Sequence, residues 1–190
     1  RDASKKYPFI ELIRIEKCGN RSFGSKSHAF QIGYLVLRNM EIKYVGNLDA
    51  DITLPTYYYR KIIERMIDKP AIGVSSGYCL DKVKGGFQKV VSSQNHAVGA
   101  VHLWRKDVYD LVGGYNPVTV GGMDSIALFA ARMRGWTTIS FQDIPIFHHK
   151  PVGTGAARNY SKIAWRSGMT EYYIGTIPLF AIAKSVRRWR

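Results

Sequence analysis

A mostly apolar run at residues 42–48 ends in Asp49-Ala50-Asp51, and a helical pattern begins after Pro55. We interpret the run as a buried strand whose end carries both carboxylates. α/β proteins place catalytic and ligand-binding residues at such strand ends. Side chains two positions apart on an extended segment point the same way, so Asp49 and Asp51 can together hold a divalent cation that a diphosphate also ligates. Asp-x-Asp turns are also common in surface loops, and the pattern alone leaves that alternative open.

Strand-like and helix-like segments alternate along the chain. Strands are predicted at residues 9–15, 42–48, 71–74, 100–104 and 137–141. Helices are predicted at residues 25–38, 55–67, 106–111, 123–134, 156–174 and 178–189. This order predicts a three-layer α/β domain, with a mixed sheet flanked by helices and with functional loops along one sheet edge. Residues 75–94, rich in Ser, Gly and Lys, are expected to form an irregular connection.

Two of the predicted helices carry more detailed expectations. In the helix at 25–38, the apolar face is formed by Ala29, Ile32, Gly33, Val36 and Leu37. In the helix after Pro55, Thr53 is the expected N-cap. The core face of that second helix is formed by Tyr58, Ile62, Ile63 and Met66.

Length and composition indicate one globular domain with an anion-attracting surface. The 190 residues are 46% hydrophobic and 22% charged, which is ordinary for a soluble domain. An excess of 28 Lys and Arg over 14 Asp and Glu gives a net charge of +14, so nucleotide diphosphates, nucleic acid and anionic lipid are all candidate partners. Cys18 and Cys79 match no metal-ligand spacing and are interpreted as buried or free thiols in a reducing compartment. The apolar stretch at 172–183 falls short of the roughly 20 residues that span a bilayer.

Five modest motifs, spread over residues 9–160, occur in an order that resembles a family 2 glycosyltransferase. The resemblance implies a GT-A (Rossmann-like) fold and inverting transfer of a hexose from a nucleoside diphosphate sugar to an acceptor hydroxyl, with Mg²⁺ or Mn²⁺ as cofactor. The matching residues are Gly24-Ser25-Lys26 with Ala29 and Gly33, Leu48-Asp49-Ala50-Asp51, Gly99 with Arg105 and Gly113-Gly114-Tyr115, Gly121-Gly122-Met123-Asp124, and Arg132 with Gly135-Trp136 and His148.

The resemblance assigns roles in binding the donor. Asp51 would ligate the cation that bridges the diphosphate, and Asp49 would contact the ribose or the water shell of the metal. A cation there would neutralise the charge that develops on the departing nucleoside diphosphate. Lys26, at a predicted helix start, would contact the donor, although a lysine at a helix N-terminus is often simply solvated.

The resemblance also assigns a base and a further metal ligand. Asp124 would take the proton from the acceptor hydroxyl. An Asp after Gly121-Gly122 is equally suited to cap a helix, and the two roles are compatible. Met123 stands where the family usually has Glu. His148 would be a third metal ligand, with His149 as an equally placed competitor.

The family usually begins with an apolar strand and an Asp-containing segment that hold the base and ribose, and neither precedes Phe9. We therefore expect residues 1–175 to form a catalytic domain that lacks its first nucleotide-binding strands and is a poor enzyme by itself. We expect residues 176–190 to form a basic amphipathic helix near the membrane. The expected acceptor is a saccharide or a lipid-linked molecule in envelope polysaccharide or glycolipid synthesis, at the cytoplasmic face of the membrane.

Two other classes of function agree with parts of the sequence. A basic nucleic-acid-binding module would agree with the net charge, but the positive residues are scattered rather than arranged along one helix, and we expect no nucleic-acid partner. A non-catalytic relative that binds a nucleotide sugar or a membrane surface is the other alternative. Loss of metal-dependent nucleotide binding in Asp51→Ala would separate the enzyme from a nucleic-acid-binding module. Loss of transfer with donor binding kept in Asp124→Asn would separate it from a non-catalytic relative.

Overall fold

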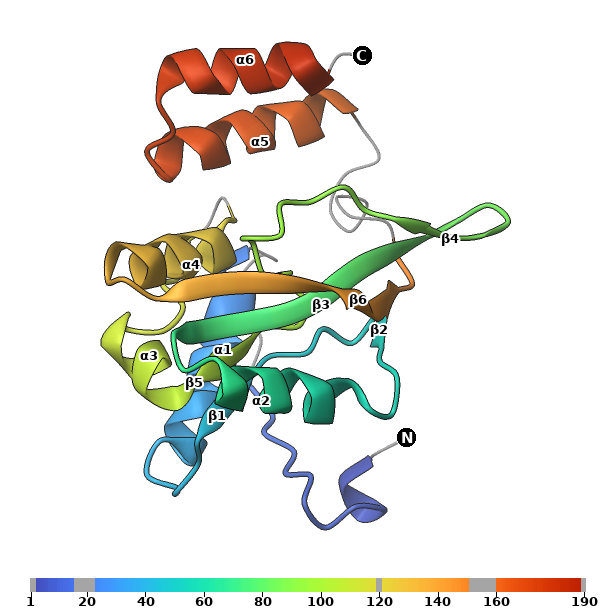
Figure 1. The fold of residues 1–190 in the computed structure, drawn as a ribbon, viewed down its shortest axis with the longest axis vertical. Helices are drawn as coiled ribbons and strands as arrows, with labels where there is room; N and C mark the ends of the chain where they lie inside the picture. The colour runs from blue at the N-terminus through green and yellow to red at the C-terminus, as the bar shows by residue number, and fades with distance from the viewer. Residues whose placement is uncertain (1–2, 16–22, 119–120, 151–159, 189–190) are drawn as a thin grey trace.

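The computed structural model describes residues 3–15, 23–118, 121–150 and 160–188. A mixed six-stranded sheet is flanked by helices (Figure 1), so the predicted three-layer α/β architecture is confirmed. The strands are β1 (Tyr44–Gly46), β2 (Ile52–Thr53), β3 (Ile72–Val83), β4 (Gly86–Lys89), β5 (Leu103–Arg105) and β6 (Thr137–His148). The α-helices are α1 (Phe23–Leu37), α2 (Tyr58–Asp68), α3 (Lys106–Leu111), α4 (Met123–Met133), α5 (Tyr160–Tyr173) and α6 (Pro178–Arg188).

The order of the strands decides where the aspartates lie. The sheet runs β1-β5-β3-β6-β2, with β4 paired to β3 outside this path. β3 and β6 are parallel, and the other described pairs are antiparallel. Because β1 and β2 stand at opposite ends of the order, the segment at residues 47–51 crosses the ends of the strands between them. Asp49 and Asp51 therefore lie at the edge of the sheet that is formed by the ends of its central strands.

Separate hydrophobic clusters cover the two faces of the sheet. One forms between α2 and the sheet, where Tyr58, Ile62 and Met66 are buried against Ile144 and Ile146. The other forms between the sheet and the helices on its other side, and includes Val74, Ala97, Trp104, Val108, Tyr109, Tyr115, Met123, Ala127, Leu128 and Ala131. Partly buried Phe30 and Tyr34 of α1 pack against this second cluster.

Several local predictions are wrong. Residues 9–15 form no strand and are mostly exposed, with Phe9 at 84%. Thr53 is not an N-cap, because it pairs with Phe147 in the sheet and α2 begins only at Tyr58. Residues 75–94 are not irregular throughout, since β3 continues to Val83 and turns at Lys84 and Gly85 into β4.

Helix α1 starts and ends within two residues of its prediction but presents a different face to the core. Ser27 is fully buried, whereas Val36 and Leu37 of the predicted face are exposed at 45% and 41%. Aromatic rings at Phe30 and Tyr34, rather than aliphatic side chains, anchor the helix against Tyr109. Among the described residues, no helix is long and apolar enough to cross a bilayer.

Candidate functional site

Backbone hydrogen bonds hold Asp49 just past the end of β1. The Asn47 N–H donates to the His102 carbonyl at 3.0 Å, and the Asp49 N–H donates to the Ala100 carbonyl at 2.9 Å. These bonds continue the β1–β5 pairing beyond the strands. The Asn47 side-chain amide also donates to the Gly99 carbonyl at 2.9 Å. The half-exposed carboxylate of Asp49 is 2.6 Å from the Lys26 ammonium.

His148, rather than His149, faces Asp51. Nε2 of His148 lies 3.7 Å from Oδ1 of Asp51, while Nζ of Lys150 lies 3.9 Å from Oδ2. His149 donates its backbone N–H to the Asp51 carbonyl at 2.9 Å, and its ring Nε2 lies 2.7 Å from the Thr53 hydroxyl. The ring of His149 is therefore engaged away from the Asp51 carboxylate. An imidazole nitrogen and a carboxylate oxygen at this spacing suit a divalent cation.

The other ring nitrogen of His148 contacts a second carboxylate. Nδ1 lies 2.8 Å from Oδ1 of Asp81, which the thiol of Cys79 also contacts at 3.4 Å. Cys79 is buried, and burial, reinforced by the negative charge of Asp81, raises the pKa of this thiol to about 12. In Cys79, Asp81 and His148, one potential metal-ligand atom from each side chain lies within 4.8 Å of the other two.

Asp124 lies in the first turn of α4, directly against the chain that pairs with Asp49. Gly121 and Gly122 precede the helix with φ of 96° and 86°, a left-handed conformation that glycine adopts without strain. A Cβ added at Gly99 would come within 2.8 Å of Cγ of Asp124. Only glycine therefore leaves room for this carboxylate beside the segment that binds Asn47 and Asp49.

A buried polar network lies beneath the carboxylates of Asp49 and Asp124. The Tyr115 hydroxyl donates to Asn47 at 2.8 Å, accepts from the Trp104 indole at 3.0 Å and lies 2.8 Å from Nδ1 of His102. Burial lowers the pKa of His102 to about 4, although the charge of Asp124 opposes that shift. Burial raises the pKa of Tyr115 well above its usual value, and Asp124 and Asp49 both add to the increase. Both carboxylates are thus close enough to act on one hydroxyl.

The candidate residues from the sequence lie in two contacting groups along the segment at residues 47–51. Lys26 pairs with Asp49, His148 faces Asp51, and Asp124 adjoins the chain beside Asp49. Sequence reasoning missed Asp81, which falls in the segment predicted to be irregular. Gly85-Gly86 after a β-prone run was the available signal, because glycines there mark a tight hairpin, whose turn residues are Lys84 and Gly85.

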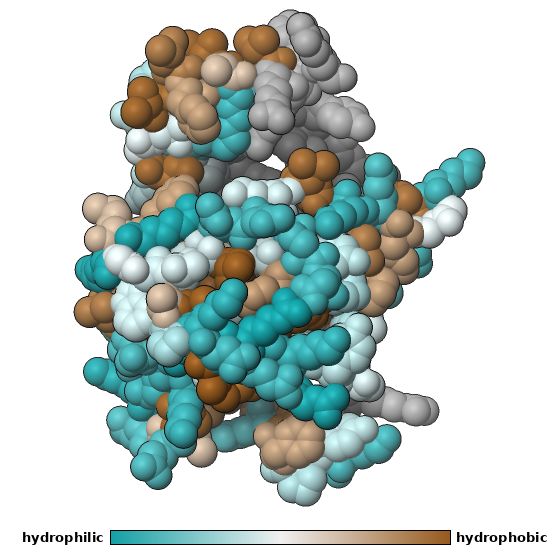
Figure 2. Space-filling model, viewed as in Figure 1, coloured by the Kyte–Doolittle hydropathy of each residue, from teal (hydrophilic) through white to brown (hydrophobic). Residues whose placement is uncertain are grey.

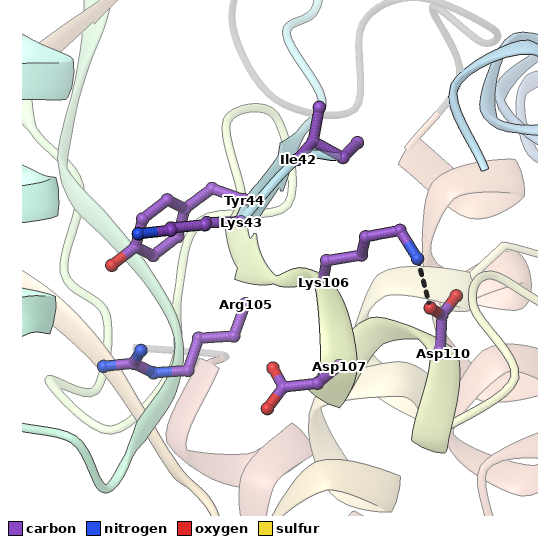
Figure 3. Close-up of a pocket in the computed structure, with 7 residues that line it drawn as sticks. All are labelled: Ile42, Lys43, Tyr44, Arg105, Lys106, Asp107 and Asp110. Atoms are coloured by element: carbon purple, nitrogen blue, oxygen red, sulfur yellow. Dashed lines mark hydrogen bonds and ion pairs between the residues drawn. The ribbon is translucent and has the colours of Figure 1, made fainter. Parts of the chain in front are cut away.

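A hollow of about 410 Å³ lies at the other end of β1 and is a separate feature (Figure 3). It is lined by Ile42, Lys43, Tyr44, Arg105, Lys106, Asp107 and Asp110. Three of its charged groups are engaged with protein partners: Lys106 pairs with Asp110 at 2.9 Å, and Arg105 donates to the Ile72 carbonyl at 2.8 Å. β1 runs from this hollow toward Asp49, and neither Asp49 nor Asp51 lines the hollow.

Comparisons with known proteins identify the fold. No protein-family model and no curated protein sequence matches the chain. The structure is similar to that of the mannosyltransferase PcManGT from Pyrobaculum calidifontis, solved with GDP-Man and Mn²⁺, at a TM-score of 0.60 and 17% identity over 97% of this chain and 49% of that one. It is also similar to GalNAc-T7, solved with UDP, GalNAc and Mn²⁺, at a TM-score of 0.50 and 11% identity over 78% of this chain and 38% of that one.

The chain thus spans about half the length of PcManGT and a smaller part of GalNAc-T7. At these identities the likeness concerns the fold, and the prediction of a GT-A-like α/β fold is confirmed.

Proposed function

We propose that the chain is the catalytic part of an inverting, family 2-like hexosyltransferase that moves a sugar from a nucleoside diphosphate sugar to an acceptor hydroxyl. The observation that supports the proposal is that the His148 imidazole faces Asp51 while Asp124 adjoins the chain that pairs with Asp49, two residues away in the same segment. Both solved structures described above share the fold, and both contain a nucleotide or nucleotide sugar together with Mn²⁺.

The residues at this edge fit a Mg²⁺ or Mn²⁺ ion. Asp51 and His148 are partly buried and offer an oxygen and a nitrogen ligand 3.7 Å apart, donors that Mn²⁺ accepts. When bound, the ion would supply positive charge that stabilises the departing nucleoside diphosphate. Asp49 would contact the ribose or the water shell of the ion. Lys26, held at 2.6 Å from Asp49, would bring a positive charge to the donor phosphates.

Asp124 would act as the general base. Its carboxylate would accept the proton of the acceptor hydroxyl while the hydroxyl oxygen forms a bond to the anomeric carbon, and the bond from that carbon to the nucleoside diphosphate breaks on the opposite face. The nucleoside diphosphate leaves with the bonding electron pair, and attack from the face opposite to it inverts the configuration at the anomeric carbon. Gly99 supports this role by leaving the carboxylate in place beside the chain that holds Asp49.

Calorimetric titration of the chain with GDP and with UDP, with and without Mn²⁺, tests the proposal, followed by a screen of donor sugars. Asp51→Ala should abolish the metal dependence of nucleotide binding. Asp124→Asn should keep donor binding and lose transfer. Asp143→Asn is the matched control, because this exposed carboxylate of β6 pairs with Arg65 of α2 rather than with a residue of the candidate site. Transfer that survives in both of the first two variants would refute the assignment.

We further propose that residues 176–190, with α5, dock the enzyme on an anionic membrane at its cytoplasmic face, where a saccharide or lipid-linked acceptor of envelope synthesis would be used. Apolar side chains gather on the α5–α6 hairpin at the top of Figure 2. Tyr172, Leu179 and Trp165 are exposed at 87%, 77% and 74%. The hairpin also lies against the start of α4, since a Cβ at Gly122 would meet Thr170 of α5 at 2.8 Å.

Cosedimentation with phosphatidylcholine vesicles, with and without phosphatidylserine, tests the membrane proposal. Binding should require the anionic lipid and should fall when Leu179 and Phe180 are replaced with serine, because membrane affinity depends on buried apolar area as well as charge. Equal binding to both vesicle types would contradict the proposal.

A further inference from the structure

The parallel pairing of β3 with β6 places a carboxylate behind His148. Asp81 and His148 are register partners at the ends of these strands. Nδ1 of the imidazole is 2.8 Å from Asp81, while Nε2 is 3.7 Å from Asp51. His148 is thus held between two carboxylates, one at each ring nitrogen, and its side chain is only 12% exposed.

We propose that Asp81 is a positioning residue that fixes the tautomer and orientation of His148 so that its Nε2 lone pair faces Asp51. An ionised carboxylate only accepts hydrogen bonds, so the proton shared with Asp81 belongs to Nδ1 of the imidazole. A neutral imidazole has one N–H, and Nε2 is then unprotonated and available to a cation. The proposal rests on the proposed function, in which His148 is a metal ligand.

The geometry at Cys79 supports a positioning chain rather than a second metal centre. Its thiol lies 3.4 Å from the same Oδ1 of Asp81 that contacts His148. A thiol that keeps its proton can donate to this oxygen, whereas a metal centre at the cluster would require a thiolate. The hydrogen bonds therefore run from Cys79 and from His148 toward Asp81, and the imidazole turns its other nitrogen to Asp51.

The expected loss of Mn²⁺ affinity on removal of Asp81 can be taken from other metal sites. Partners that hold the second nitrogen of a ligating histidine typically contribute about 10–100-fold to metal affinity. We therefore expect Asp81→Ala to weaken Mn²⁺ binding by about 10–100-fold. Asp81→Asn keeps an oxygen that can accept from Nδ1 and should recover part of that loss.

Two measurements on the chain test the proposal. The first is the Mn²⁺ dissociation constant without nucleotide, measured by electron paramagnetic resonance for wild type, Asp81→Ala, Asp81→Asn, Cys79→Ala and Asp143→Asn. The second is the ring-nitrogen NMR spectrum of His148 in the metal-free chain at about pH 8, above the ordinary histidine pKa. Wild type should carry its ring proton on Nδ1, and Asp81→Ala should lose that preference.

The outcomes separate this proposal from the proposed function. Mn²⁺ binding that Asp51→Ala leaves unchanged would contradict the metal site itself, while the NMR spectrum would still report on Asp81. Binding that weakens in Asp51→Ala but not in Asp81→Ala, with the Nδ1 proton retained in Asp81→Ala, would overturn only the positioning role. A loss in Cys79→Ala as large as that in Asp81→Ala would also overturn it, because Cys79 would then be a ligand.

Discussion

Replacing Gly99 with alanine tests whether Asp124 acts at the reacting centre. The three atoms nearest to the added Cβ all belong to Asp124: Oδ2, which it would overlap, Cγ at 2.8 Å and Cβ at 3.0 Å. Carbon atoms in favourable contact lie about 3.5–4.0 Å apart, so the carboxylate has to move by about 1 Å. Misplacing a catalytic group by about 1 Å costs about 100-fold in rate, or about 2.7 kcal/mol of transition-state stabilisation.

The assay compares the rate of sugar transfer, from the donor identified by screening, with the Mn²⁺ dissociation constant. Gly99→Ala should lose transfer and keep its metal affinity, because the methyl group displaces Asp124 and not Asp51 or His148. Gly33→Ala is the matched control: no heavy atom lies within 4 Å of its added Cβ. As a substitution inside a helix, it should raise stability by about 0.5–1 kcal/mol without changing the rate. A Gly99→Ala rate within about threefold of wild type would refute the positioning of Asp124 inferred here.

Three further predictions concern the network beneath the site and the donor contact. Burial lowers the pKa of His102 from 6.5 to about 4, so the unfolded chain binds the proton first as pH falls. The free energy of unfolding should stay constant above pH 6.5 and fall by about 3 kcal/mol toward pH 4, at about 1.4 kcal/mol per pH unit. Urea unfolding at a series of pH values should show this fall in wild type and not in His102→Gln. Tyr115→Phe leaves the buried Trp104 indole and the side-chain Oδ1 of Asn47 without this partner and should cost about 2 kcal/mol or more in the same unfolding assay. A loss below about 0.5 kcal/mol would contradict the network. Lys26→Ala removes an exposed pair and should change stability by less than about 1 kcal/mol, yet weaken nucleotide binding by about tenfold in calorimetry; unchanged affinity would exclude Lys26 from the donor site.

Helix periodicity predicted the strongly amphipathic elements well. α2 buries Tyr58, Ile62 and Met66 as their spacing indicates, and α4 ends where Gly135, with φ of 84°, follows it. In α1, by contrast, apolar residues occur on every side, so spacing could not identify the face that packs. Ring contacts with Tyr109 decide that face, and those contacts depend on tertiary structure.

The candidate site was predicted in part, because its residues follow strand ends and helix starts that local patterns mark. Asp49, Asp51 and Asp124 are of this kind. The choice of His148 over His149 was not available from the sequence, because adjacent side chains on a strand point to opposite faces and only the register decides between them. Pairing of Ile52 with His148 sets that register and directs His149 to the Thr53 hydroxyl.

The register that joins Asp81 to His148 depends on an irregularity in β6. Between the pairs Gly77–Phe141 and Tyr78–Pro145, residues 142–144 have no partner in β3. Gly77 permits this bulge, because a Cβ there would overlap the Ile144 carbonyl and come within 3.0 Å of the Tyr58 ring. With a different number of bulged residues, His148 would lie opposite another position of β3, and a shift of one residue would turn it to the other face of the sheet. Gly77, four residues before Asp81 in β3, thus helps to determine which carboxylate lies behind the imidazole.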